Sequence, residues 1–81
     1  MKTQEIIPLS MLPVGKKCEV VSLSSSGIER RRMLDLGLIG GTSVEAVLKS
    51  PSGDPVAYYI RGAVIALRDN DAEKITVRYL C

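Results

Sequence analysis

Two alternating segments joined by a dense turn constrain this sequence more than any other feature. From Thr42 onward apolar residues alternate with polar ones, and the same period of two returns after Val56. Residues 51–55, between the two segments, read Pro-Ser-Gly-Asp-Pro and consist of residue types that favour turns. This pattern predicts a β-hairpin with residues 51–55 at its tip.

Further short strands are predicted on both sides of this hairpin. Three segments are rich in apolar and β-branched residues, namely 16–23, 63–67 and 75–80. Gly62 separates the segment 63–67 from the second strand of the hairpin. Residues 7–15 read as a lead-in with one short turn, because Pro8 and Pro13 prevent a long helix. About five short strands with tight turns predict a mainly-β fold, a small and partly open β-barrel whose closure hides its strand edges.

One helix is predicted over residues 27–36. Ser26 followed by Glu29 is the sequence of a capping box, in which each side chain satisfies the backbone N–H of the other residue. Gly37 is expected to end the helix at positive φ, with Leu38 folding back on the last turn. A single helical turn is expected at residues 69–74, with Asn70 and Glu73 as a second capping pair.

The predicted helix carries a run of three arginines with two interpretations. We expect its apolar face to consist of Ile28, Met33, Leu34 and Leu36. In the first interpretation, Arg30, Arg31 and Arg32 form a contact patch that binds RNA, an acidic partner or lipid headgroups. In the second, they form a solvated helix face on which the aliphatic stems of the arginines cover apolar surface.

Length and composition exclude several classes of protein. The chain has 81 residues and 46% hydrophobic residues, which predicts a single folded domain over residues 1–81. Its longest apolar run, residues 63–67, is far shorter than the roughly 20 residues of a membrane span. No apolar signal-peptide core follows the start, so a cytoplasmic location is expected. A net charge of +2 with few aromatic residues argues against nucleic-acid binding.

The residues that usually carry catalysis or metal binding are scarce. The chain has no histidine and only two cysteines, which excludes a structural zinc finger and makes catalysis an unlikely expectation. Cys18 is expected as a small core residue of a strand and Cys81 as a terminal residue. Together they are weak candidates for a soft-metal or redox pair.

Several short motifs, in their order and spacing, resemble the FeoA family over residues 9–77. They are Leu-Ser-Met-Leu-Pro-Val-Gly at 9–15, Arg-Met-Leu-Asp-Leu-Gly-Leu at 32–38, Gly-Thr-Ser-Val-Glu at 41–45, Pro-Ser-Gly-Asp-Pro at 51–55, Arg-Gly at 61–62 and Ala-Leu-Arg at 66–68. Gly40 departs from the family, which commonly has Pro before the Gly-Thr pair. We expect this departure to loosen the turn and to leave the fold intact.

The resemblance implies an SH3-like barrel with a short helix inserted after the first barrel strand. It also implies a non-catalytic accessory role in bacterial ferrous iron uptake, with docking on the cytosolic part of the membrane GTPase-permease FeoB. No nucleic acid and no direct membrane insertion are expected. No cofactor is expected either, because a chain without histidine and with scattered carboxylates is poorly suited to hold Fe²⁺ tightly.

These inferences assign expected roles to particular residues. The expected partner contacts are Arg30, Arg31, Pro51, Asp54 and Pro55. The expected structural residues are Ser26, Glu29, Gly37, Gly41, Arg61 and Gly62. Two alternatives stay open, a metal-sensing module that uses Cys18, Cys81 and carboxylates, and a small barrel that binds nucleic acid.

Overall fold

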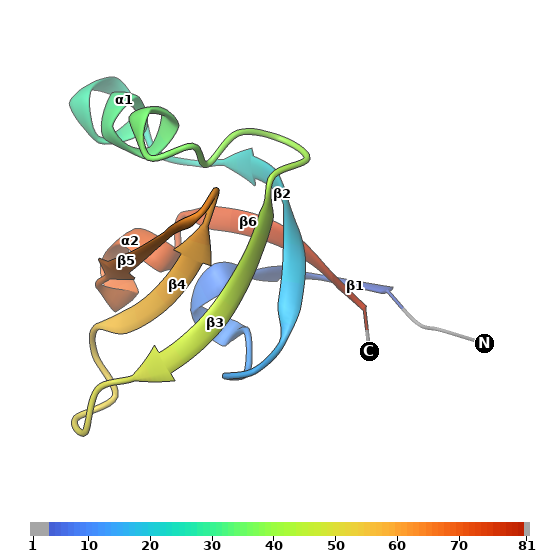
Figure 1. Cartoon of the computed structure of the whole chain (residues 1–81). Helices are drawn as coiled ribbons and strands as arrows, with labels where there is room; N and C mark the ends of the chain where they lie inside the picture. The colour runs from blue at the N-terminus through green and yellow to red at the C-terminus, as the bar shows by residue number, and fades with distance from the viewer. Residues whose placement is uncertain (1–3, 81) are drawn as a thin grey trace.

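The computed structural model describes residues 4–80 as six strands and three short helical segments (Figure 1). In chain order they are β1 (Gln4–Pro8), the 3-10 helix η1 (Leu9–Met11), β2 (Lys17–Leu23), α1 (Gly27–Asp35), β3 (Ser43–Lys49), β4 (Val56–Ile60), β5 (Ala63–Leu67), α2 (Asp69–Ala72) and β6 (Ile75–Leu80). The predicted hairpin between β3 and β4 and the helix between β2 and β3 are confirmed.

All six strands belong to one antiparallel sheet in the order β1-β6-β2-β3-β4-β5. The sheet curls strongly around the core, as Figure 1 shows. Its two edge strands, β1 and β5, are not paired with each other in the described part of the chain. The prediction of a mainly-β, partly open barrel is therefore confirmed.

The first strand was not expected from the sequence, and the predicted count of about five strands is one too few. β1 pairs with β6 from Gln4 opposite Leu80 to Pro8 opposite Thr76. On its own this segment has little strand character, because Pro8 ends it and only Ile6 and Ile7 are apolar. Its extended form comes from pairing with a strand about 70 residues later in the chain.

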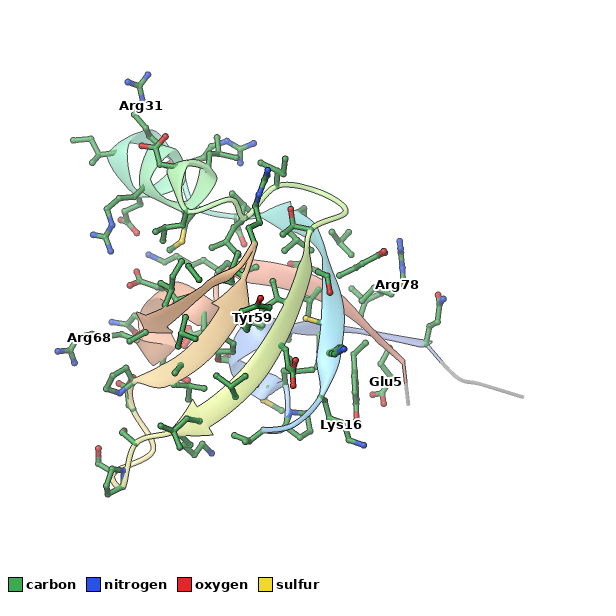
Figure 2. All side chains as sticks on the ribbon, viewed as in Figure 1. Glu5, Lys16, Arg31, Tyr59, Arg68 and Arg78 are labelled. Atoms are coloured by element: carbon green, nitrogen blue, oxygen red, sulfur yellow. The ribbon has the colours of Figure 1, made fainter. Side chains whose placement is uncertain are left out.

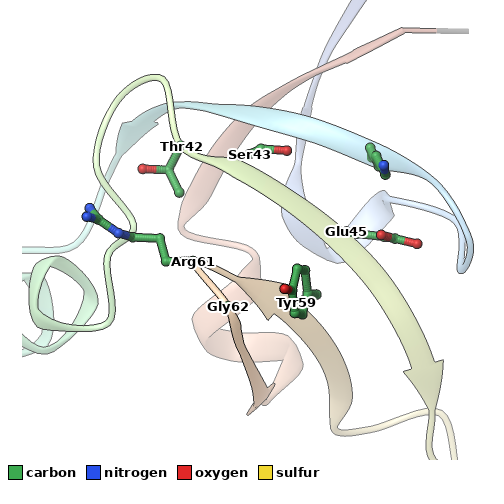
Figure 3. Close-up of a pocket in the computed structure, with 7 residues that line it drawn as sticks. Thr42, Ser43, Glu45, Tyr59, Arg61 and Gly62 are labelled. Carbon is green, nitrogen blue, oxygen red and sulfur yellow. The ribbon is translucent and has the colours of Figure 1, made fainter.

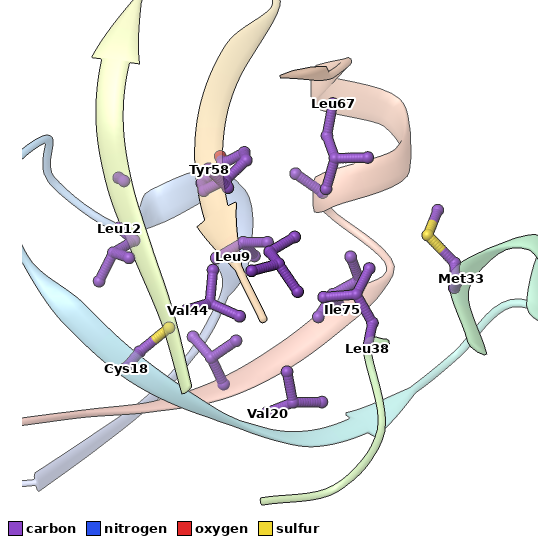
Figure 4. Packing of buried hydrophobic residues seen from close by; sticks show 14 residues of the cluster. Leu9, Leu12, Cys18, Val20, Met33, Leu38, Val44, Tyr58, Leu67 and Ile75 are labelled. Carbon is purple, nitrogen blue, oxygen red and sulfur yellow. The ribbon is translucent and has the colours of Figure 1, made fainter. Parts of the chain in front are cut away.

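The core lies inside the curl of the sheet (Figure 4). Leu9 of η1 fills its centre together with Val44 of β3 and Ile75 of β6, and all three are fully buried. Tyr58 is buried and its neighbour Tyr59 is exposed, because successive side chains of a strand point to opposite faces of the sheet. The other buried apolar residues are Leu12, Cys18, Val20, Met33, Leu38, Ala46, Ile60, Leu67, Ala72 and Val77.

A register shift in β3 corrects the predicted alternation of that strand. Val44 and Ala46 are buried as expected, but Leu48 is 66% exposed. The pairing with β4 shifts between Ala46 and Leu48, because β3 has one more residue than β4 at this point. The side chain of Leu48 therefore points to the opposite face of the sheet from that of Ala46. As a result, both Val47 and Leu48 lie on the outer surface.

The capping boxes expected for the two helices are absent from the structure, so both predictions are wrong. Ser26 is the N-cap of α1, but its side chain makes no capping hydrogen bond. Glu29 instead accepts a hydrogen bond from Nζ of Lys74 at 2.8 Å. The N-cap of α2 is Arg68 rather than Asn70, and the backbone N–H of Asp69 donates to Oδ1 of Asp54 at 2.9 Å.

The C-terminal end of α1 follows the prediction. Gly37 has φ +94°, and its N–H donates to the carbonyl of Leu34 at 3.0 Å. The N–H of Leu38 donates to the carbonyl of Met33 at 3.0 Å, which completes a Schellman motif. Leu38 and Met33 are both buried, so the turn that ends α1 also fixes the helix to the barrel.

The apolar face predicted for α1 is wrong at two of its four positions. Met33 is buried and Leu36 is half-buried, whereas Ile28 is 84% exposed and Leu34 is 39% exposed. The reason is visible in Figure 1, where α1 projects from one end of the barrel instead of lying along it. Only a narrow side of the helix therefore meets the core.

Candidate interaction surface

The arginine run on α1 divides into two anchored side chains and one that points outward. Arg30 donates from Nη1 to the carbonyl of Leu23 at 3.4 Å, and Nη2 of Arg32 lies 3.9 Å from Oδ2 of Asp71. Arg31 makes no hydrogen bond or ion pair with any residue between 4 and 80. Figure 2 shows its side chain extending away from the molecule. The fold therefore holds Arg30 and Arg32 in place, whereas the side chain of Arg31 faces solvent.

Arg31 stands beside exposed apolar side chains of the same helix. A shallow hollow in the surface of α1 is lined by Gly27, Arg30, Arg31, Leu34 and Asp35. Leu34 follows Arg30 by four positions and Arg31 by three, so it shares a helix face with both guanidinium groups. An apolar surface bordered by two cations is suited to a partner that combines an apolar side chain with a carboxylate. We call the exposed side of α1 formed by Ile28, Arg30, Arg31 and Leu34 the α1 surface.

Two ion pairs hold the opposite side of α1 to the barrel. Lys74, which follows α2, donates to Glu29 at 2.8 Å, and Asp71 of α2 faces Arg32. The hydrogen bond and charge of Lys74 lower the pKa of Glu29, and Glu29 in turn raises the pKa of Lys74. Because these pairs occupy Glu29 and Arg32, the charge of the hollow on α1 is set by Arg30, Arg31 and the carboxylate of Asp35, and two cations against one anion leave it positive.

A tight turn places Arg61 against the end of α1. Arg61 (φ +49°) and Gly62 (φ +86°) are the two turn residues between Ile60 and Ala63, as a type I′ hairpin requires. The side chain of Arg61 lies so close to Gly37 that a Cβ at Gly37 would overlap Cδ of Arg61. Gly37, Arg61 and Gly62 thus meet where the β4–β5 turn contacts the end of α1. Figure 3 shows Arg61 reaching from the hairpin toward the helix.

Gly41 also has the conformation that its expected structural role demands. Its φ is +90°, and its N–H donates to the carbonyl of Val20 at 2.8 Å. The N–H of Thr42 donates to the carbonyl of Ile39 at 3.0 Å, which closes the turn around Gly40. The turn is thus formed with Gly at position 40.

The second expected contact region, the hairpin tip, lies at the other end of the molecule from α1 (Figure 1). The N–H of Gly53 donates to the carbonyl of Ser50 at 2.8 Å, and Oγ of Ser52 donates to the carbonyl of Asp54 at 3.0 Å. Asp54 uses its carboxylate to cap α2, while Pro51 is exposed and Pro55 half-buried. The structure therefore does not bring the tip together with Arg30 and Arg31.

A third surface feature was not expected from the sequence. Residues of β2, β3 and β4 and of two turns line a hollow of about 430 Å³ on the outer face of the sheet (Figure 3). They are Lys17, Thr42, Ser43, Glu45, Tyr59, Arg61 and Gly62. Tyr59 is the aromatic wall of this hollow and is 47% exposed. The sequence offers one signal of this hollow, the pair Tyr58-Tyr59. Successive side chains of a strand point to opposite faces, so one of two adjacent tyrosines must point outward.

Cys18 is a core residue of β2, as expected from its strand position. Its side chain is 6% exposed, and burial raises the pKa of the thiol to about 11. At neutral pH Cys18 is therefore a protonated thiol, not the thiolate that binds a metal. Its weak candidate partner, Cys81, lies outside the described residues. Among residues 4–80 no cluster of three or more Cys, Asp or Glu side chains is arranged to hold a metal ion.

The sequence model of the FeoA domain family matches residues 7–79, which is nearly the whole chain. The chain belongs to the FeoA family. Members of this family are associated with ferrous iron transport and are generally non-catalytic accessory proteins.

One curated relative of this FeoA chain is the Fe(2+) transport protein A/Fe(2+) transporter FeoB fusion protein of Porphyromonas gingivalis. The two are 35% identical over 72 residues, which cover 89% of this chain and 8% of the relative. The chain thus spans less than a tenth of the length of that relative. In that protein a FeoA unit and a FeoB transporter form one polypeptide.

Solved structures of FeoA proteins superpose well on this FeoA chain. The FeoA protein of Chlorobium tepidum is 37% identical with a TM-score of 0.85, covering 93% of this chain and 71% of that one. Stenotrophomonas maltophilia FeoA, solved with zinc and described as an SH3 domain protein, is 30% identical with a TM-score of 0.77, covering 85% and 86%. The fold is therefore SH3-like, with its short helix after β2. No helix within residues 4–80 has the length and apolar character needed to cross a membrane.

Proposed function

We propose that this chain is a non-catalytic, cytoplasmic accessory component of ferrous iron uptake that docks on the cytosolic region of a FeoB-type transporter. Its membership of the FeoA family supports the link to ferrous iron transport. The fused relative supports the choice of partner, because it carries FeoA and FeoB in one chain. Covalent fusion keeps two units at a high effective concentration, which is useful when they bind each other.

The observation that carries this proposal is the α1 surface. Ile28 is 84% exposed, the highest value among the exposed large apolar residues that the structure describes. Arg31 beside it is exposed and unpaired within the described chain. Apolar and arginine side chains together are the composition that is enriched at the centre of protein interfaces.

The charge of the α1 surface indicates the chemistry of the surface that it binds. Arg30 and Arg31 favour a partner patch with carboxylates, and Leu34 between them favours an apolar side chain in the same patch. The affinity should then fall as salt concentration rises, because the exposed cations are screened. The apolar part of the contact should persist at high salt.

The experiment is a titration of the purified chain against the isolated cytosolic region of the FeoB transporter, at low and moderate salt and with and without guanine nucleotide. The test variant is Arg31→Glu, since Arg31 has no role inside the described structure. The double variant Arg30→Glu/Arg31→Glu should weaken binding further. The matched control is Arg68→Glu, an equal charge change at an exposed arginine that points away from α1 (Figure 2).

We expect Arg31→Glu to weaken binding at least about tenfold, which corresponds to roughly 1.4 kcal/mol. Arg68→Glu should lower the affinity only by the small amount that the change in net charge produces. Equal losses for both variants would show that only net charge matters and would remove the α1 surface from the proposal. Absence of binding by the folded parent chain in every condition would reject FeoB as the partner.

A further inference from the structure

The two edges of the sheet differ sharply in how they are protected. β1, at one edge, carries Pro8 and the charged Glu5, both of which discourage another strand from pairing. β5, at the other edge, reads Ala-Val-Ile-Ala-Leu and has neither a charge nor a proline. Its pairing with β4 runs without a bulge from Ile60 opposite Ala63 to Val56 opposite Leu67. β5 is therefore a regular, apolar and unguarded edge.

The backbone groups that β5 leaves free follow from its hairpin. In a two-residue turn the flanking residues form a hydrogen-bonded pair, so Ala63, Ile65 and Leu67 bond to β4. The N–H and C=O groups of Val64 and Ala66 then point to the open side. No backbone hydrogen bond from elsewhere in residues 4–80 reaches them. The residue between the bonded positions Ala63 and Ile65, Val64, is also 64% exposed.

We propose that β5 is a self-association edge, which pairs antiparallel with β5 of a second copy of this chain about a two-fold axis at Ile65. In this register Val64 lies opposite the partner's Ala66, and Ala66 lies opposite the partner's Val64. Each of these pairs exchanges both of its backbone hydrogen bonds, so every free group of the edge is satisfied. The sheets of the two copies join into one continuous sheet. This pairing does not rest on the proposed docking to FeoB.

Charge complementarity at the two ends of β5 favours a second copy in this orientation. Arg61 stands just before the strand, whereas Asp69 follows it and Asp54 caps the helix there. Antiparallel pairing places Arg61 beside the partner's Asp69, and the two-fold axis repeats the contact. Arg68 carries a like charge close to this contact. Its side chain points away from the molecule (Figure 2), so its repulsion of the partner's Arg61 is small.

The first test measures the mass of the full chain by sedimentation equilibrium from about 10 µM to 1 mM, the range in which a small interface associates. We expect the average mass to rise toward that of a dimer. Val64→Lys places a charge on the edge and should raise the dimer dissociation constant at least about tenfold. The matched control is Leu48→Lys, since Leu48 is 66% exposed, almost equal to Val64, but lies on an interior strand.

The second test fixes the register by cross-linking. Residues that face each other across the two-fold axis in a non-hydrogen-bonded pair have Cα atoms about 4.5 Å apart, within the range of a disulfide. In a Cys18→Ala/Cys81→Ser background, Ile65→Cys should oxidise to a covalent dimer. Val64→Cys in the same background should not, because the two copies of residue 64 do not face each other.

Several results would overturn the inference. A monomer at every concentration, with circular dichroism showing a folded chain, rejects self-association. Equal effects of Val64→Lys and Leu48→Lys place the contact on the outer face of the sheet instead of the edge. Cross-linking by Val64→Cys without cross-linking by Ile65→Cys rejects the register. A monomeric parent whose binding to FeoB is lost in Val64→Lys assigns the edge to the transporter.

Discussion

At the scale of single residues, Gly37 occupies a position where a side chain would be unfavourable for two separate reasons. Its φ of +94° is a conformation that side chains rarely adopt, and the stem of Arg61 lies directly against its Cα. The first reason concerns the end of α1 and the second concerns the β4–β5 turn. One residue therefore couples the helix to the hairpin.

We expect Gly37→Ala to lower the free energy of unfolding by about 1–3 kcal/mol, because it adds backbone strain and displaces Arg61. Gly53→Ala is the control, since Gly53 has a similar φ of +92° but open space around it. Urea denaturation should show the larger loss for Gly37→Ala. The excess should shrink in Gly37→Ala/Arg61→Ala, and equal losses at both glycines would contradict a role for Arg61.

The pair between Glu29 and Lys74 makes stability depend on pH in a defined direction. Lys74 lowers the pKa of Glu29 below its ordinary 4.5, so the pair stabilises the fold above that pH. This contribution is lost as pH falls through the lowered pKa of folded Glu29. Thermal melts from about pH 6 down to pH 2 should show a steeper loss for the parent chain than for Glu29→Gln. Lys74→Gln should flatten the profile equally, and an unchanged slope in either variant would contradict the pairing.

At the scale of elements, α1 is attached to the barrel by little. Met33 is its one buried residue, and the remaining attachments are two ion pairs, the hydrogen bond from Arg30 to the carbonyl of Leu23, the half-buried Leu36 at its end and the contact of Gly37 with Arg61. Exposed ion pairs contribute little to stability, so Met33 carries most of the attachment. A helix held in this way should open more readily than the sheet.

Met33→Ala should therefore release α1 before it unfolds the sheet. Truncation of a buried methionine costs about 2–5 kcal/mol when the surroundings stay in place. We expect hydrogen exchange of the α1 amides to accelerate at least tenfold while β2 and β6 stay protected. Leu34→Ala, at a 39% exposed position, is the control and should change little. Uniform acceleration over the whole chain would show that α1 and the sheet unfold as one unit.

The parts of the fold that could be predicted are those that neighbouring residues determine. The end of α1 depends on Gly37 and on residues within one helical turn, so the sequence pattern sufficed. The capping box failed because Lys74, 45 residues later, takes the side chain of Glu29. Likewise β1 depends on its pairing with β6, and the exposure of Ile28 depends on the direction in which α1 leaves the barrel.

At the scale of the whole molecule, the α1 surface and the hairpin tip lie at opposite ends of the barrel (Figure 1). Contacts this far apart share no neighbouring residues, so their energies should add. We expect the loss of FeoB affinity in Arg31→Glu/Pro51→Ser to equal the product of the single losses, measured by calorimetry. A double loss that departs from that product by more than about twofold would show that the two regions are coupled.

The pairing of β1 with β6 has a consequence for how this module is connected to other proteins. Gln4 lies opposite Leu80, so the first and last described residues are neighbours at one corner of the sheet. A tether attached at either end would leave from the same corner (Figure 1). Such a tether would pass clear of α1 and of β5, which lies at the far edge. The module can thus be carried as an N-terminal or a C-terminal appendage without turning α1 or β5 toward its carrier.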